Sequence, residues 1–368
     1  MPLPNQTMSL ASGSSPTRNP PVRRRLRIAA VMTVVIVAVA WVGYGIAIGT
    51  LFGRAIDDWI DAHRAEGYAI SYAARDDVRR PWGTQTVFHQ PVITAPPGAE
   101  PWTWQGERAV VALNPLRPDR VNIDLKGGHE LIRRGNRPAH VFGQAASLQF
   151  LVSQSAARVD GADIALTFQD GHRLTVAALA GSAKPVSTNP GVPAIALTLG
   201  AADITVPADW QFPLGPEIAG AEVVATLVGP PPPAATGPAI RAWSAAGGLV
   251  EIEKLDLAYG PAILAGSGTF TFDADAQPLA ALAVTMQGFL ETVNALRDRG
   301  LMRREDAFAA RFILSALAQA PDDGGPPRLS ASLTVQDREL SIGPLVLLRL
   351  PAIAWSEPGG GKGVTPAR

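Results

Sequence analysis

The feature that most constrains this chain is an uncharged, apolar run at residues 28–51. A helix of about 20 apolar residues crosses the hydrocarbon core of a bilayer, so this run predicts one transmembrane helix. Arg23, Arg24, Arg25 and Arg27 precede it, and the N-terminal part of the chain before them carries no acidic residue. By the positive-inside rule, these arginines place the N-terminal tail in the cytoplasm and the rest of the chain across the membrane.

A cleaved signal peptide is the first alternative to a retained anchor. The apolar region of a signal peptide is only roughly 7–15 residues long and ends at a cleavage site of small residues. The run is longer than this, Gly45-Ile46-Ala47 is a poor cleavage signal, and Trp41 and Tyr44 suit the far membrane interface. We therefore predict a retained anchor. A twin-arginine export signal is the weaker alternative.

Composition predicts a globular domain after the helix. Charged residues make up 17% of the chain and apolar residues 47%, which is typical of a protein with a large core. Residues 1–27 and 356–368 have little apolar content or are rich in glycine, and we predict disordered tails there. Residues 52–355 are the predicted periplasmic domain.

Charge and cysteine content exclude several classes of function. Beyond the membrane helix, acidic residues outnumber basic ones, which is the opposite of the bias in a nucleic-acid-binding protein. The chain has no cysteine, so disulfides, thiolate metal sites and thiol catalysis are excluded.

Short alternating segments predict an antiparallel β architecture. They are separated by turn residues at spacings typical of all-β folds. The expected strands lie at residues 68–73, 84–94, 102–104, 109–113, 121–125, 140–151, 162–168, 173–177, 195–199, 203–206, 222–227, 249–257, 261–265, 268–273, 280–286, 329–335, 339–342 and 345–350. Residues 114–120 are expected to be a rigid turn. We therefore predict a mainly β protein with a long, curved antiparallel sheet.

A few helices interrupt this pattern. Residues 54–66 have helical periodicity and are expected either to pack on the domain or to form a stalk on the outer leaflet, the first being favoured. Phe289, Val293 and Leu296 predict one short helix, and a second contains Ala307, Phe312, Leu314 and Leu317. The proline run at 230–233, within residues 229–238, is interpreted as a long loop inside one sheet system or as a domain linker.

Several motifs resemble those of a known family. They are the basic patch and membrane helix, Glu66-Gly67-Tyr68, residues 114–125 with Gly128-His129, residues 247–257, residues 266–272 and Gly343-Pro344. Together they resemble the bacterial family catalogued as domain of unknown function 2125, which is similar in turn to AsmA-like proteins. The resemblance implies an inner-membrane-anchored periplasmic protein of the cell envelope, with an apolar groove linked to phospholipid traffic. Where members often have a Gly-aromatic-Pro turn, this chain has Arg80-Pro81-Trp82-Gly83, so nothing is transferred to that loop.

No catalytic or metal-binding motif is found, and the family supplies no catalytic residue. His63, His89, His129, His140 and His172 lack metal-ligand spacing. Gly266-Ser267-Gly268 has the wrong context for a nucleophile elbow, and the acidic residues of 57–61 are expected to face solvent. We therefore predict a protein that is not an enzyme and has no cofactor or metal. A membrane-tethered hydrolase is the least favoured hypothesis.

The apolar alternating positions allow two interpretations. They are ordinary core residues, or some of them line an open groove that holds acyl chains, since such a site needs only apolar walls and a polar rim. The candidate groove residues are Ile164, Leu166, Phe168, Leu197, Leu199, Leu255, Leu257, Phe270 and Phe272. The leading hypothesis is lipid binding, with phospholipid as the candidate ligand. The alternative is an envelope scaffold or assembly factor that docks a protein partner through exposed strand edges.

Overall fold

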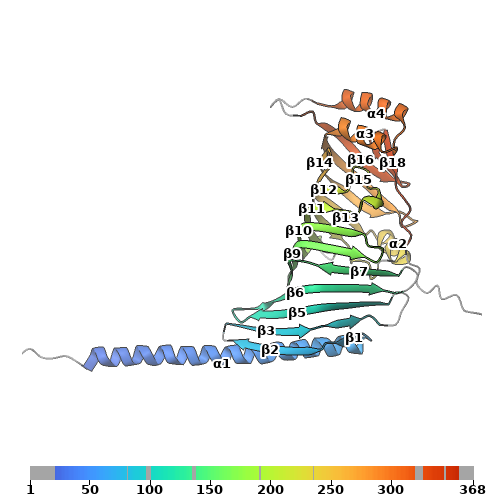
Figure 1. Ribbon diagram of the computed structural model, residues 1–368. Helices are drawn as coiled ribbons and strands as arrows, with labels where there is room; N and C mark the ends of the chain where they lie inside the picture. The colour runs from blue at the N-terminus through green and yellow to red at the C-terminus, as the bar shows by residue number, and fades with distance from the viewer. Residues whose placement is uncertain are drawn as a thin grey trace, which may run out of the picture.

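The computed structural model describes residues 21–80, 82–96, 101–134, 138–189, 192–234, 236–319, 326–343 and 345–355. In these ranges it forms one antiparallel sheet of 18 strands and four α-helices (Figure 1). The predicted fold class, a mainly β protein with an N-terminal apolar helix and a few short helices, is therefore confirmed.

The helices are α1 (Pro21–Ala65), α2 (Gly237–Ala245), α3 (Phe289–Asp298) and α4 (Arg304–Leu317), with a 3₁₀ turn at Ala208–Trp210. The strands of the first half are β1 (Ala69–Ser71), β2 (Ala74–Arg80), β3 (Gly83–His89), β4 (Val92–Thr94), β5 (Trp102–Asn114), β6 (Arg117–Arg133), β7 (Ala139–Gln144), β8 (Ser147–Ser153) and β9 (Ala157–Phe168). Those of the second half are β10 (Arg173–Asn189), β11 (Val192–Thr205), β12 (Glu217–Val228), β13 (Leu249–Tyr259), β14 (Ala262–Phe272), β15 (Pro278–Gln287), β16 (Leu329–Gln336), β17 (Glu339–Ile342) and β18 (Leu345–Arg349).

The sheet is a ladder of strands in nearly sequential order. From β8 to β18 each strand pairs with the next one along the chain. Near the N-terminus, two positions in the sheet are each filled by a pair of short strands that lie end to end. Strands β3 and β4 both pair with β5, and strands β7 and β8 both lie between β6 and β9. The ladder rises from α1 at one end to α3 and α4 at the other (Figure 1).

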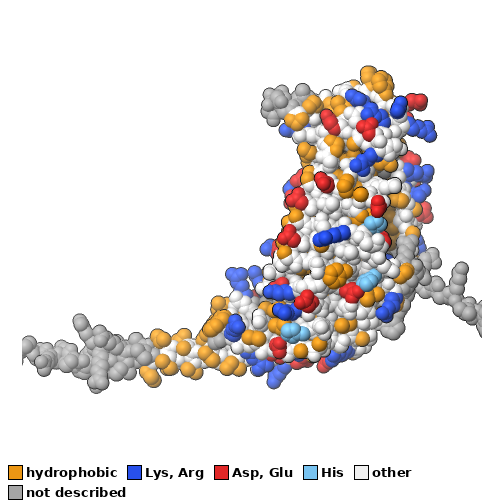
Figure 2. Space-filling view, viewed as in Figure 1, with side chains coloured by type: hydrophobic (Ala, Val, Ile, Leu, Met, Phe, Trp, Pro, Cys, Tyr) orange, Lys and Arg blue, Asp and Glu red, His pale blue; other side chains and the backbone are white. Residues whose placement is uncertain are grey.

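The helix α1 is continuous through the membrane-helix candidate and the segment expected at 54–66. It is long and apolar enough to cross a membrane, and apolar side chains cover the described portion, from Met32 on, that projects from the sheet (Figure 2). Its C-terminal half packs on the first strands, where Ile60 is buried with Phe88 and Ala109. The favoured interpretation of residues 54–66, a helix packed on the domain, therefore describes the structure. Residues 21–27, assigned to the tail, are helical.

Several strands are longer than their sequence patterns. The segments expected at 102–104 and 109–113 form the single strand β5, and those at 261–265 and 268–273 form β14. The turn expected at 114–120 is shorter than predicted, because β6 begins at Arg117. The proline run lies in the connection between β12 and β13, which pair directly with each other, so the same sheet continues on both sides of the run.

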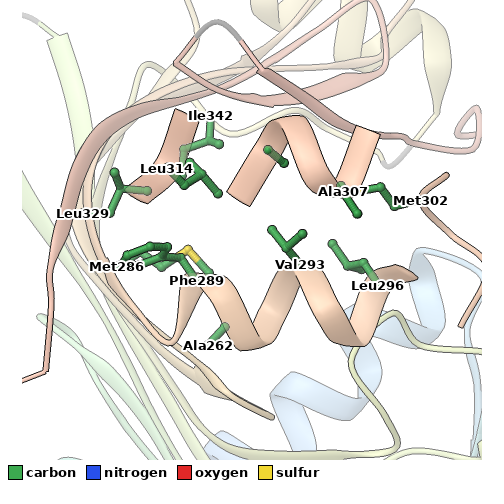
Figure 3. Packing of buried hydrophobic residues seen from close by; sticks show 11 residues of the cluster. Ala262, Met286, Phe289, Val293, Leu296, Met302, Ala307, Leu314, Leu329 and Ile342 are labelled. Carbon is green, nitrogen blue, oxygen red and sulfur yellow. The ribbon is translucent and has the colours of Figure 1, made fainter. Parts of the chain in front are cut away.

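The largest buried apolar cluster lies between α3, α4 and the last strands of the sheet. Leu329 from β16 and Val293 from α3 are fully enclosed, and Leu314 from α4 faces them (Figure 3). The predicted helix pair is thus present, and Gly300 separates α3 from α4 with φ at 72°. Phe312 and Leu317 are exposed, however, so these two residues do not belong to the core stripe to which the pattern assigned them.

Candidate functional site

The sheet has one apolar face, which runs unbroken through its successive strands. We define this apolar face by a row of register partners that crosses from β3 to β16. The row is Thr86, Val111, Ile123, Phe150, Val159, Gly181, Leu199, Val223, Leu255, Gly266, Val284 and Ala331. None of these residues carries a charge.

The neighbouring row, one residue along each strand, contains the charged and amide side chains as well as small and apolar ones, and it defines the polar face. It is Val87, Val110, Asp124, Gln149, Asp160, Ala180, Gly200, Glu222, Asp256, Ala265, Thr285 and Ser330. Because side chains alternate between the faces of a strand, the two rows point to opposite sides of the sheet. From β6 onward the charged and polar side chains of the two rows therefore lie on one side of the sheet only.

The predicted groove residues of the central strands lie on the apolar face. Leu199 and Leu255 belong to the row, and Leu197 and Leu257 lie two residues away on the same strands. On β14, Phe270 and Phe272 follow at alternate positions from Gly266, with ring centroids 5.0 Å apart.

The remaining three predicted residues, Ile164, Leu166 and Phe168, reach the same face through a local irregularity. Asp163 adopts a left-handed conformation with φ at 49°. In a regular strand, residues three apart point to opposite faces. Here Gly161 and Ile164 share a side, since a Cβ added to Gly161 would lie 2.7 Å from Cδ1 of Ile164. The structure therefore places all nine predicted residues on one face.

This face is uncovered in its middle and covered at its ends. Helix contacts with the sheet concentrate where α1 meets β1–β3, where α2 and α3 meet β14, and where α4 meets β16. Leu199, in the middle of the row, is 53% exposed, whereas Val284, beneath the helical end, is 3% exposed. An apolar ligand would therefore find its open surface on the central strands.

A glycine in the row affects the local shape of the apolar face. A Cβ added to Gly181 would lie 2.9 Å from Cγ1 of Val159 and 3.5 Å from Cδ1 of Leu199. The side chains of both neighbours thus lean over Gly181. The branched side chains of Val159 and Leu199 therefore occupy the space that a side chain at position 181 would fill.

The polar face carries two adjoining hollows lined largely by alanine, glycine and serine. One, of about 520 Å³, extends from Ala178 to Ala265, and the other, of about 700 Å³, extends from Ala265 to Ser332. On the rim of the first, Lys254 Nζ lies 2.6 Å from Glu222 and 2.9 Å from Asp256. These two carboxylates raise the pKa of Lys254 to about 12.

Two histidines have perturbed environments away from the central strands. Burial lowers the pKa of His129, whose ring stacks on Trp104 at 5.6 Å. His172 lies between Asp209 (3.0 Å) and Asp170 (2.8 Å), and hydrogen bonds to these carboxylates raise its pKa. Among the described residues, no group of three or more His, Cys, Asp or Glu side chains is placed to hold a metal ion.

Sequence reasoning missed other members of the apolar row. Ile123, Phe150, Val159 and Val223 occupy the same face as the predicted residues. At Val159 the sequence does show the apolar–polar alternation of a strand, because Arg158 and Asp160 flank it. Val159 was not predicted as a groove residue because the strand was expected to begin at residue 162, whereas β9 begins at Ala157.

Comparison with known proteins identifies the family only. No curated protein and no solved structure matches the chain, and the expected similarity to AsmA-like proteins is not shown. A family model described as "Uncharacterized protein conserved in bacteria (DUF2125)" matches residues 48–351, which include every strand described above. The chain therefore belongs to this bacterial family of uncharacterized proteins, as its turn and glycine motifs predicted.

Proposed function

We propose that this protein is a single-pass protein of the bacterial inner membrane that binds phospholipid acyl chains on its apolar face, in the periplasm. The observation that carries the proposal is the uncharged row from Thr86 to Ala331. Neighbouring strands lie ~4.8 Å apart, so the row extends across about 50 Å of sheet. The helices cover the two ends of this row and leave its middle open. An open apolar surface on a monomer marks an interaction site rather than a typical solvent-facing sheet.

The membrane topology in this proposal rests on charge. The arginines at 23, 24, 25 and 27 precede the apolar part of α1, and no acidic residue accompanies them. Positive residues next to a membrane helix stay in the cytoplasm, so the sheet is assigned to the periplasmic side.

We infer a binding role rather than a catalytic one. The row contains no titratable side chain, and acyl-chain binding requires none. The apolar face has the composition of a lipid-binding wall, and charged residues such as Asp160 and Glu222 lie on the opposite face.

The test uses two adjacent residues with opposite orientations. A photo-crosslinking amino acid is placed at Leu199 on the apolar face or at Thr198 on the polar face, in the full-length protein in its native membrane. We expect phospholipid adducts by mass spectrometry from position 199 and none from position 198. Equal adducts at both positions, or none at either, would contradict lipid binding on this face.

A disruption experiment completes the test. Leu199→Asp places a charge on the apolar face, whereas Thr198→Asp adds the same charge to the polar face. Native mass spectrometry of the purified full-length protein is expected to show loss of bound phospholipid for Leu199→Asp only. Circular dichroism and thermal unfolding confirm that both variants fold.

A second candidate function, docking of a protein partner, is favoured by features at the far end of the ladder. The last strand, β18, carries the half-exposed Val346, and α4 exposes Phe308 (76%) and Phe312 (74%). By contrast, β2 at the other end carries several charged residues, which protect an edge from pairing. Photo-crosslinking from Phe312 tests this function: one defined protein adduct supports it, and lipid adducts or no adduct contradict it.

A further inference from the structure

The helix α1 is covered by the sheet well before its apolar part ends. A buried stripe begins near Trp41 and continues through Gly45, Gly49 and Phe52 to Ile60. These positions repeat at helical spacing and form one side of the helix. The sheet therefore overlaps the part of α1 that was expected to lie inside the membrane.

Specific contacts show which part of the sheet overlaps it. Arg75 is hydrogen-bonded to Asp57, and a Cβ added to Gly49 would lie 3.3 Å from the side chain of Arg79. Further back along the helix, the hydroxyl of Tyr44 donates a hydrogen bond to the carbonyl oxygen of Pro115 (3.0 Å). Strand β2 and the β5–β6 turn thus run back along α1 toward its N-terminus.

The length of the uncovered helix fixes the depth of these turns. Residues 28–40 supply only about 20 Å of helix, because each residue adds 1.5 Å. The hydrocarbon core is about 30 Å thick and requires about 20 residues, so the membrane reaches residue 47 or beyond. Tyr44 lies about three residues before the end of this span, so the turn that it contacts reaches the boundary between the hydrocarbon core and the lipid headgroups.

The turns carry the side chains that suit this position. Trp82 in the β2–β3 turn and Leu116 in the β5–β6 turn are each 70% exposed. Arg79, Arg80 and Arg117 flank them and are also exposed. Tryptophan prefers the membrane interface, and arginine forms paired hydrogen bonds with phosphate oxygens.

A small hollow of about 200 Å³ lies next to these turns. Arg80 and Trp82 line it together with Gln85, Asn114 and Asn122. A cationic group, an indole and three amide side chains in one hollow offer both charge and hydrogen-bond donors to a phosphate group.

We propose that these two turns are anchored in the leaflet on the side of the membrane where the sheet lies. Trp82 and Leu116 are inserted among the lipids, and the three arginines bind the headgroups of anionic phospholipids. This inference rests on α1 spanning the membrane, as in the proposed function. Because the strands next to α1 lie along the helix, the membrane meets the ends of β2, β3, β5 and β6. The ladder, which rises away from α1, then extends beside the bilayer (Figure 1). Since α1 covers Thr86 at the start of the apolar row, lipid from the leaflet would meet the row farther along the ladder, on the uncovered central strands.

The absence of cysteine makes the test direct. Single cysteines are introduced at Trp82 or Leu116, labelled with a nitroxide, and studied in the full-length protein in nanodiscs of phosphatidylcholine with phosphatidylglycerol. Power-saturation electron paramagnetic resonance compares access to oxygen, which concentrates in lipid, with access to a water-soluble nickel complex. Val37→Cys in α1 is the membrane reference, and Asp275→Cys in an exposed distant turn is the aqueous reference.

We expect the ratio of oxygen to nickel access at positions 82 and 116 to be several-fold higher than at 275. If the labels at 82 and 116 match position 275 while Val37 is immersed, the turn anchor is refuted and the membrane helix stands. If Val37 is also in water, α1 does not cross the membrane, and both this inference and the proposed topology fail.

The headgroup contact has its own control. Replacing Arg79, Arg80 and Arg117 together by glutamine is expected to lower the ratio at position 116 in nanodiscs that contain phosphatidylglycerol. In nanodiscs of phosphatidylcholine alone, the same variant is expected to change the ratio much less. An identical effect in both lipids would overturn the role of anionic headgroups.

Discussion

Leu329→Ala is predicted to destabilise one end of the ladder without unfolding the other. Leu329 is fully buried, with 0% of its surface exposed, and lies in the cluster that joins α3, α4 and the last strands. Its neighbours Met286, Leu314 and Ile342 come from different elements and are themselves buried (Figure 3). The space left by the lost methyl groups therefore cannot be closed by moving one element alone.

The expected cost follows from this enclosure. Leucine-to-alanine substitutions in cores cost about 2–5 kcal/mol, and the upper part of this range applies where the site does not collapse. We expect a loss of about 3–4 kcal/mol for the C-terminal end of the sheet. Leu301→Ala is the matched control, because Leu301 is half exposed and its truncation is expected to cost well under about 1 kcal/mol.

Hydrogen exchange measured by mass spectrometry on the full-length protein locates the effect. Each strand from β8 onward pairs with its neighbours in chain order, so stability is expected to depend on local interfaces, as in repeat proteins. Exchange should accelerate in β14–β18, α3 and α4 and stay unchanged in β3–β6. Uniform acceleration along the chain would refute this reasoning and show that the sheet unfolds as a single unit.

Two further predictions concern charged groups. The pKa of His172 is raised in the folded protein, so its contact with Asp209 stabilises the loop below the ordinary histidine pKa, and this stabilisation is lost as the pH rises through the folded pKa. The exchange protection factors of residues 206–212, which are corrected for the intrinsic effect of pH on amide exchange, should therefore fall as the pH rises, and His172→Gln should abolish that fall. Lys254→Met leaves Glu222 and Asp256 facing each other as register partners without their shared cation, so the melting temperature should fall at low ionic strength and partly recover in high salt, which screens the repulsion. A Lys254→Met variant with the same melting temperature at both salt concentrations would show that the two carboxylates do not repel each other.

The periodic parts of the fold were predictable from the sequence. Alternation in residues 222–227 and 249–257 gave strands that the structure contains, because one apolar face and one polar face leave a clear period of two. The break at Gly300 was predictable because glycine tolerates the left-handed conformation that ends α3.

Other parts depend on tertiary context. Strand β2 has only two apolar residues, Ala74 and Val78, and it forms because β3 offers a pairing edge and Asp57 of α1 binds Arg75. The helix α2 follows a proline run that suggested a loop or a domain linker, and it is held by Trp243, which is buried beside Phe272. Pattern alone gives no signal for elements that are stabilised mainly by their neighbours.

The candidate site was predictable as a set of side chains but not as a surface. Alternation identified Leu197 and Leu199 as one side of a strand, yet it could not place Ile164 on that same side, because the flip at Asp163 depends on its backbone conformation. It also could not separate open positions from covered ones. Phe312 has the spacing of a core residue and is exposed on α4, while its neighbour Leu314 is buried.

The difference between open and covered positions leads to a last prediction about how much of the row holds lipid. Val284 is buried beneath the helical end, whereas the side chains of the row from Phe150 on β8 to Leu255 on β13 are half-buried or exposed and lie away from the main helix contacts. This part of the row is about 24 Å wide at ~4.8 Å per strand. Photo-crosslinking residues at Val159 and Val223 should therefore form phospholipid adducts as at Leu199, whereas one at Ala331 should form none. Adducts at Ala331 would mean that α3 and α4 move off the sheet, and that the row conducts lipid along its whole length instead of holding it in the middle.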